Sequence, residues 1–225
     1  MLTVQAALLE TNCYVLASGN GGSCVLIDPG LGVIEPLSAV LETHELSLDA
    51  ILLTHGHIDH TADAPALSRE HRVPIYVHPG DREHLQDPLA ALGPELGGML
   101  QASLGSTAEF WTVPDDVREL SDGQQLEAGG VRLDVIHAPG HTAGSVLFHA
   151  AADPEGTERC FTGDVLFAGS IGRTDLPGGD TAQMRTSLTD RVLTLADPTV
   201  VLPGHGPAST IERERRTNPF LGDLT

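Results

Sequence analysis

The sequence contains no lysine and few basic residues of any kind. Its 12 cationic side chains are all arginine, whereas aspartate and glutamate number 31, which gives a formal net charge of -19. Nucleic acids and anionic membrane surfaces both require basic patches, so we expect neither as a partner. Cysteine is also scarce: Cys13, Cys24 and Cys160 are widely spaced and form no metal-binding or disulfide pattern. A reducing, cytoplasmic location is therefore expected.

Long apolar segments are absent as well. No run approaches the roughly 20 apolar residues of a membrane-spanning helix, and the N-terminus lacks the charged start and apolar stretch of a secretory signal. The 225 residues contain no internal repeat, and 40% of them are hydrophobic. We therefore predict one domain over residues 1–225 with a substantial core, and the sequence leaves its oligomeric state open.

Short apolar segments alternate with turn sequences and predict both strands and helices. Strands are expected at 13–17, 23–27, 50–53, 73–77, 131–136, 145–150, 159–162 and 199–202, and helices at 33–43, 62–71, 182–195 and 209–216. Residues 81–104 should be helical or irregular, within an insertion at 79–114. Two packed sheets with helices on their outer faces would bury these patterns.

Histidine and aspartate are concentrated in four short segments. Residues 54–60 read Thr-His-Gly-His-Ile-Asp-His, and three later turns add one side chain each. Together they supply His55, His57, Asp59, His60, His141, Asp164 and His205. Each segment follows an apolar strand, and loops at the ends of rigid strands can bring distant side chains together.

The dense run at 55–60 predicts metal binding. A single histidine after a strand usually has a structural role, but three imidazoles and a carboxylate in six residues would all need hydrogen-bond partners. Imidazole and carboxylate suit zinc, iron and manganese. Seven such groups are enough for two divalent ions, and zinc is the metal we expect. The other histidines are interpreted as structural: His44, His71, His78, His84, His137 and His149.

These motifs resemble the metallo-β-lactamase superfamily, which carries the same His-x-His-x-Asp-His signature. The similarity extends from Thr-Asn-Cys-Tyr at 11–14 to Thr-Asn-Pro-Phe at 217–220. The segment 161–180 is most similar to the short, single-domain form of glyoxalase II, a hydroxyacylglutathione hydrolase. The resemblance implies an α+β fold, a four-layer αβ/βα sandwich, and hydrolysis of S-D-lactoylglutathione or a related 2-hydroxyacyl thioester.

The resemblance also implies a role for each residue of the set. One metal ion would be held by His55, His57 and His141, the other by Asp59, His60 and His205, and Asp164 would bridge them. Asp59 and Asp164 are the expected catalytic residues among these ligands. Asp28 is expected behind the ligands, fixing a loop near the histidines, although it could also be a simple turn residue before Pro29.

Substrate recognition is less well defined by the motifs. Arg173 lies nine residues after Asp164 and matches a basic residue that contacts the thiol carrier in glyoxalase II. Only 20 residues follow His205, so the C-terminal helical domain that helps grip glutathione is expected to be missing. Another thiol carrier therefore remains open.

The expected chemistry favours a thioester. Two metal ions about 3.5–4 Å apart can share a hydroxide, whose parent water has its pKa lowered toward about 7, and this hydroxide would attack the carbonyl carbon. A thiolate, with a reference pKa near about 8.5, leaves without a proton, whereas an amide nitrogen does not, and no general acid is evident beyond the ligands. Common metallo-β-lactamases have cysteine at the position of Asp164, which also argues against lactam hydrolysis.

The sequence leaves three alternative functions. A persulfide dioxygenase of the same superfamily would use one iron on two histidines and Asp164, and it shares the Gly-Arg-Thr-Asp run at 172–175, although the continuation at 176–180 favours the glyoxalase group. A metallo-nuclease is disfavoured by the acidic composition. A non-catalytic metal-binding or scaffold protein is disfavoured because no ligand is missing.

Overall fold

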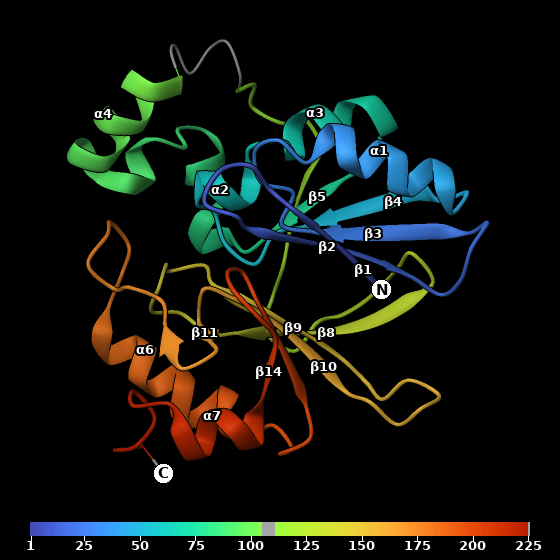
Figure 1. Ribbon diagram of the computed structural model, residues 1–225. Helices are drawn as coiled ribbons and strands as arrows, with labels where there is room; N and C mark the ends of the chain where they lie inside the picture. Colours follow the sequence, from blue (N-terminus) through green and yellow to red (C-terminus); the bar gives the residue numbers. More distant parts are fainter. Residues whose placement is uncertain (105–110, 225) are drawn as a thin grey trace.

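The computed structural model describes residues 1–104 and 111–224. Its strands form two six-stranded sheets that lie face to face (Figure 1). The first sheet has the order β1 (Leu2–Gln5), β2 (Asn12–Ala17), β3 (Ser23–Ile27), β4 (Ser47–Leu52), β5 (Ile75–Val77) and β6 (Val117–Glu119). The second has the order β14 (Ser209–Thr210), β13 (Val200–Pro203), β10 (Arg159–Gly163), β9 (Val146–Ala150), β8 (Val131–His137) and β7 (Gln125–Ala128). A separate hairpin pairs β11 (Leu166–Phe167) with β12 (Ser170–Ile171).

Helices cover the outer face of each sheet. In Figure 1, α1 (Ile34–Thr43) and α3 (Ala64–His71) lie on the first sheet, and α6 (Thr181–Ser187) and α7 (Ile211–Thr217) lie on the second. The short α2 (Ile58–Thr61) and the longer α4 (Gly93–Leu104) lie toward one edge of the sandwich. These helices and sheets make four layers.

The hydrophobic core has the same layered arrangement. Leu37 of α1 packs with Ile51 of β4 in a cluster on the outer side of the first sheet. The next residue, Leu52, points the other way and packs with Phe148 between the sheets, as the two-residue period of a strand requires. Met184 of α6 belongs to a third cluster, outside the second sheet. The predicted αβ/βα sandwich is therefore confirmed, together with all eight predicted strands.

Three helix boundaries differ from the sequence prediction. The helix expected at 62–71 is preceded by the separate turn α2, and between the two Asp63 accepts hydrogen bonds from the backbone N–H groups of residues 32–34. The helix expected at 209–216 begins only at Ile211, because Ser209 and Thr210 pair with β13. The helix expected at 182–195 leaves α-helical geometry after Ser187 and continues as a π-helical turn, Leu188–Val192. The wider turn keeps both of its terminal apolar side chains in the core.

Three further strands, β1, β6 and β7, were not predicted from the sequence. Each lies at the edge of a sheet and contains few buried residues. Strand preference depends on packing against neighbours, so a short edge strand with little apolar alternation leaves a weak signal. The insertion predicted at 79–114 contains two 3-10 turns, Pro79–Leu85 and Ala90–Leu92, and then α4, while 105–110 lie outside the described residues. Within the described ranges, no helix is long and apolar enough to cross a membrane.

Candidate metal centre

The four histidine- and aspartate-bearing segments meet at one edge of the sandwich. The end of β4 leads to His55, and α2 follows directly with the rest of the run. The connection between β8 and β9 carries His141, the end of β10 leads to Asp164, and the end of β13 leads to His205. The structure thus brings together the seven residues that the sequence analysis selected, from segments up to 150 positions apart.

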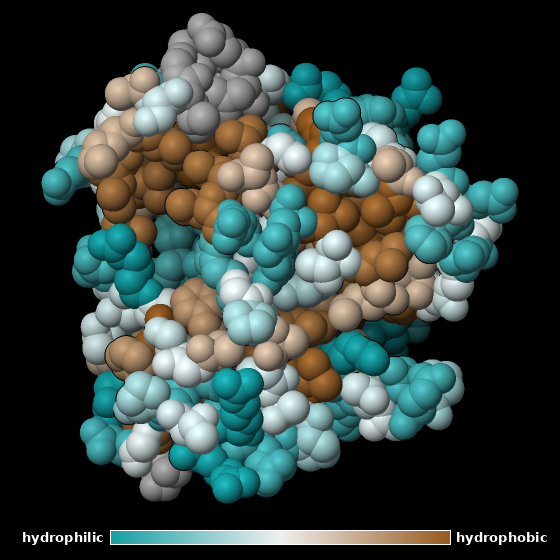
Figure 2. All heavy atoms as spheres, viewed as in Figure 1, coloured by the Kyte–Doolittle hydropathy of each residue, from teal (hydrophilic) through white to brown (hydrophobic). Residues whose placement is uncertain are grey.

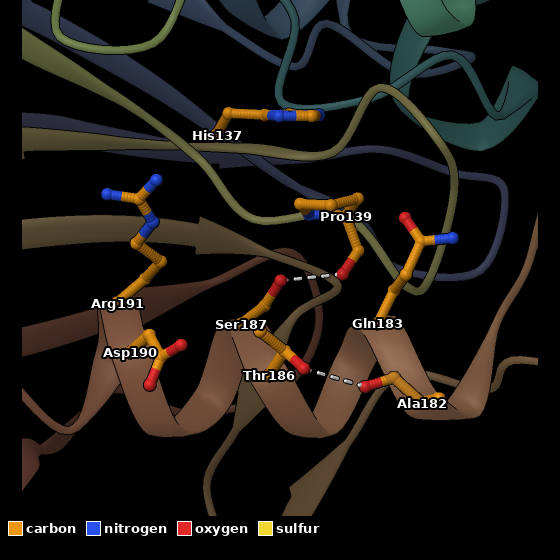
Figure 3. A pocket seen from close by; sticks show the side chains of 8 residues that line it. All are labelled: His137, Pro139, Ala182, Gln183, Thr186, Ser187, Asp190 and Arg191. Carbon is orange, nitrogen blue, oxygen red and sulfur yellow. Dashed lines mark hydrogen bonds between the residues drawn. The ribbon is translucent and has the colours of Figure 1, made fainter.

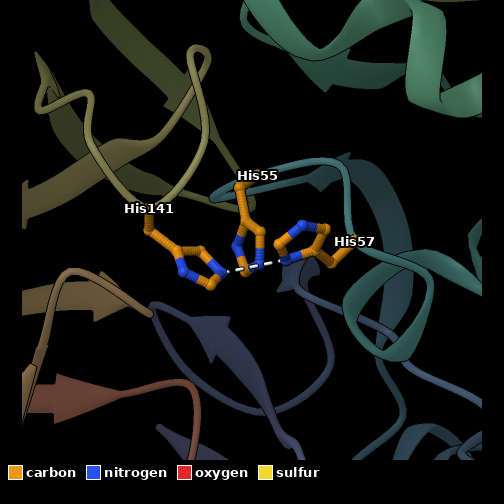
Figure 4. A group of neighbouring side chains, drawn as sticks. All are labelled: His55, His57 and His141. Carbon is orange, nitrogen blue, oxygen red and sulfur yellow. Dashed lines mark hydrogen bonds between the residues drawn. The ribbon is translucent and has the colours of Figure 1, made fainter. Parts of the chain in front are cut away.

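Three imidazoles form the first ligand group. His55, His57 and His141 each offer a ring nitrogen, and these three nitrogens lie within 4.8 Å of one another. The Nε2 atom of His141 faces Nδ1 of His57 at 2.9 Å, and the ring of His55 lies beside both (Figure 4). Three nitrogens converging from three sides leave one shared point where a cation fits.

The second group combines one carboxylate with two imidazoles. The Asp59 Oδ2 atom lies 3.2 Å from Nε2 of His205 and 3.5 Å from Nε2 of His60. Residue 204, directly before His205, must be glycine, because a Cβ atom there would collide with the Asp164 carboxylate and the His60 ring. The Pro-Gly pair therefore allows the β13 loop to approach the other ligands closely.

Asp164 lies between the two groups. Its Oδ1 atom is 3.3 Å from Nε2 of His60, and its Oδ2 atom is 3.6 Å from Nε2 of His141 and 3.5 Å from Nε2 of His205. The Oδ2 atom thus faces one imidazole of each group, while Oδ1 faces the second group. This is the position that a bridging ligand requires.

Unsatisfied atoms show that these residues fit a metal. In the described part of the chain, Nε2 of His55 and Oδ1 of Asp164 are buried without a hydrogen-bond partner. Leaving such an atom unpaired costs about 1–3 kcal/mol, so native structures rarely tolerate it. Both atoms lie in a cluster of other potential ligands. A bound cation would therefore give them the partner that no neighbouring side chain provides.

The electrostatics of the two groups differ. Burial and the neighbouring imidazoles hold the pKa of His55 well below its usual value and lower that of His57 to about 3, so both imidazoles are neutral, as metal binding requires. Burial would also lower the pKa of His60 and His205, but nearby carboxylates outweigh it. The pKa of His60 is raised well above its usual value by Asp164, and that of His205 to about 9. Without metal, the second group therefore holds protons that a cation would displace.

Backbone and carboxylate acceptors orient the ligand imidazoles. Nδ1 of His60 donates to Oδ2 of Asp28 at 2.9 Å, which leaves Nε2 for a metal. The same carboxylate accepts from the backbone N–H of Thr54 at 2.8 Å and from its hydroxyl at 2.6 Å. In the same way, Nδ1 of His205 donates to the Leu9 carbonyl, and Nδ1 of His141 to the Arg173 carbonyl. Asp28 also forms, with His55 and His60, a third group whose possible ligand atoms lie within 4.8 Å of one another, so its expected place behind the ligands stays a prediction.

Arg173 contacts the centre through its backbone. Its carbonyl accepts from His141 at 2.8 Å, whereas its guanidinium forms two hydrogen bonds to the Asp175 carboxylate, at 2.7 and 2.8 Å. The side chain is about half exposed. Contact between this guanidinium and a thiol carrier stays a prediction.

Two residues beside the ligands were missed by the sequence analysis. Asp81 is fully buried and accepts hydrogen bonds from Gly56 and Gly144 and from the Thr142 hydroxyl. It therefore links the loop of the first two histidines to the loop of His141. His84, interpreted as structural, stacks on the ring of the ligand candidate His57, with 6.2 Å between centroids and 12° between planes. Nothing in the local sequence marks these two residues, because the contacts that link them to the ligand loops come from other segments.

A hollow of about 450 Å³ lies apart from this centre, along α6 (Figure 3). Gln183, Asp190 and Arg191 line it, and Ser187 donates a hydrogen bond to the Pro139 carbonyl at its base. None of its lining residues belongs to either ligand group. We therefore assign it no part in the chemistry of the centre.

Comparison with known proteins agrees with this geometry. Residues 7–205 match the family model described as Metallo-beta-lactamase superfamily. The chain is 35% identical over 217 residues to the probable metallo-hydrolase YqgX of Bacillus subtilis, covering 96% of this chain and 95% of that protein. It is 33% identical over 224 residues to the hydroxyacylglutathione hydrolase GloC of Haemophilus influenzae, covering 97% and 96%.

Solved structures show the same fold. The structure of TTHA1623 in a di-iron-bound form has a TM-score of 0.80 and 39% identity, covering 98% of this chain and all of that one. The BLEG-1 B3 metallo-beta-lactamase has a TM-score of 0.80 and 34% identity, covering 98% and 99%. ETHE1 from Myxococcus xanthus has a TM-score of 0.72 and 25% identity, covering 97% and 84%.

Proposed function

Because the chain belongs to the metallo-β-lactamase superfamily, we propose that it is a metal-dependent thioester hydrolase of the glyoxalase II type. Its substrate would be S-D-lactoylglutathione or a related 2-hydroxyacyl thioester, which is cleaved to an acid and a free thiol. The observation that carries the proposal is the Asp164 carboxylate, which faces both ligand groups. Similarity to a hydroxyacylglutathione hydrolase supports it.

The two ligand groups support two divalent ions. We propose His55, His57 and His141 for the first, Asp59, His60 and His205 for the second, and Asp164 between them. Zinc is the expected metal, and the di-iron form of a similar structure shows that iron suits such a centre in that protein. When bound, the ions would polarise the thioester carbonyl and lower the pKa of water.

The protein's own residues hold the reacting groups in place. Asp28 and the carbonyls of Leu9 and Arg173 each fix one ring orientation before substrate arrives. The ion pair between Arg173 and Asp175 is exposed to solvent and is therefore only weakly stabilising. A carboxylate of the thiol carrier can therefore compete with Asp175 for the guanidinium.

Metal content and turnover on one preparation test the proposal. About two metal ions per chain by elemental analysis, together with hydrolysis of S-D-lactoylglutathione, are expected. A chromogenic cephalosporin should be assayed in parallel, because one similar structure is a B3 metallo-beta-lactamase. Cephalosporin hydrolysis without thioester hydrolysis would overturn the proposal.

A mononuclear iron persulfide dioxygenase is the second candidate. Two imidazoles and a carboxylate are already close together, since Nε2 of His141 lies 2.9 Å from His57 and 3.6 Å from Asp164, and such a set suits oxygen-activating iron. The complete second ligand group is unnecessary for this chemistry and favours the hydrolase. One iron per chain, no thioester turnover, and oxygen uptake with glutathione persulfide would favour the dioxygenase.

A further inference from the structure

An apolar hollow of about 270 Å³ opens beside the metal ligand candidate Asp59. Leu8 and Leu9 line it, together with Leu96 and Met99 of α4. Figure 2 shows hydrophobic side chains gathered over α4, next to a recess in the surface. We call this space the α4 hollow.

The wall of the α4 hollow is tied to the second ligand group. The Leu9 carbonyl accepts a hydrogen bond from His205 at 3.0 Å, and the Thr11 hydroxyl lies 3.3 Å from Oδ2 of Asp59 and 3.4 Å from the Leu8 carbonyl. Leu9 has a φ of 55°, a left-handed backbone that leucine rarely adopts. This loop is therefore held at the centre by contacts with the ligands.

The hollow exposes apolar side chains that a ligand would cover. Leu9 is 67% exposed and Met99 is 64% exposed, and both belong to the small set of large hydrophobic residues exposed in the described chain. Clustered exposed apolar groups usually mark a binding site. Because these two face the same space next to Asp59, a ligand that fills it would also reach the metal centre.

We propose that the α4 hollow binds the acyl side of the substrate and selects an apolar chain longer than the methyl group of lactate. This inference rests on the proposed thioester hydrolysis. Apart from Asp59, a proposed metal ligand, the described residues that line the hollow carry no charge, so they offer no cation to pair with the carboxylates of glutathione. A non-hydrogen atom of an acyl chain takes about as much volume as a water molecule, roughly 30 Å³. The hollow of about 270 Å³ therefore holds an acyl chain of up to roughly nine non-hydrogen atoms.

A comparison of two glutathione thioesters tests this selectivity. The 2-hydroxyhexanoyl thioester has three more methylene groups than the lactoyl thioester, and each buried methylene is worth roughly fourfold in binding. We expect kcat/KM for the longer substrate to exceed that for lactoyl by at least about tenfold, since burial is partial. Equal or lower kcat/KM for the longer thioester would overturn the selectivity and leave thioester hydrolysis intact.

Variants identify the hollow as the source of the preference. Met99→Gln keeps the side-chain length at an exposed position and should lower the ratio of the two kcat/KM values by about threefold or more. Val113→Gln is the matched control, because Val113 is 40% exposed and does not line the hollow. The same ratio in Met99→Gln and in the unaltered protein would overturn the assignment to this hollow.

A binding measurement separates this inference from the proposed function. If neither thioester is hydrolysed, thioester hydrolysis is wrong, and calorimetry of the metal-loaded protein with 2-hydroxyhexanoate and lactate still tests the hollow. Tighter binding of 2-hydroxyhexanoate, weakened by Met99→Gln, would support it. Equal affinities would overturn it.

Discussion

Replacing Asp81 by alanine should loosen the metal centre without touching a ligand. The Asp81 carboxylate accepts hydrogen bonds from the backbone of Gly56 at 2.8 Å, from the backbone of Gly144 at 2.7 Å and from the Thr142 hydroxyl at 2.6 Å. Gly144 has no room for a side chain, because a Cβ atom there would collide with this carboxylate. The alanine variant would therefore leave the buried N–H groups of Gly56 and Gly144 unpaired in two ligand-bearing loops, whereas the Thr142 hydroxyl would keep Ser145 as a partner.

The size of the effect follows from these contacts. A hydrogen bond to a charged group contributes about 1.5–3 kcal/mol, and removing one partner from a buried charged network costs about 3–5 kcal/mol. We expect the free energy of unfolding of the metal-free protein to fall by about 3–5 kcal/mol. This loss is smaller than the sum of the individual hydrogen bonds, because water that enters will pair with some of the donors. Loss of a residue that orients ligands should also weaken metal binding about 10–100-fold. Asp81→Asn keeps one acceptor oxygen and should lose less.

Urea unfolding of the metal-free protein and competition with a chromogenic chelator measure the two effects separately. Asp190→Ala is the matched control, because Asp190 is exposed and should change stability by less than about 0.5 kcal/mol. If Asp81→Ala unfolds like this control and binds metal with unaltered affinity, Asp81 does not hold the two loops together.

Three further predictions concern the ligands, the interior and pH. His57→Ala or Asp164→Ala should abolish metal retention and turnover together, as measured by elemental analysis and thioester assay, and full activity in either would contradict the mechanism. Thr54→Val removes a hydroxyl that bridges Asp28 and His55 and should cost about 1–3 kcal/mol in urea unfolding; a smaller change would mean that water replaces it. Burial raises the pKa of the Cys160 thiol from 9.0 to about 12. Between about pH 9 and about pH 12 this thiol therefore ionises only in the unfolded chain, so the free energy of unfolding falls as the pH rises through that range. Below about pH 9 the thiol is protonated in both states and has no effect on stability. Cys160→Ala should therefore lose less stability between about pH 8 and about pH 10.5, and an equal loss would count against this cause.

The sequence alone identified the ligand candidates because their chemistry is concentrated locally. The run at 55–60 places three imidazoles and a carboxylate within six residues. His141 and His205 each follow an apolar strand and a Pro-Gly pair. Such strands also showed their burial through apolar periodicity, which is why the eight predicted strands are all present. The assignment of a catalytic role to Asp59 and Asp164, the single domain and the cytoplasmic location stay predictions.

Only the tertiary structure decided what surrounds these ligands. Asp81 lies 60 positions from His141 in the chain, and its role depends on which backbone N–H groups the fold turns toward it. The α4 hollow likewise needs Leu9 and Met99 to line one space, although neither belongs to a sequence pattern. Ligand type is a property of single residues and can be recognised along the chain. The partners that orient a ligand and the walls that select a substrate arise from packing between distant segments, which local sequence does not encode.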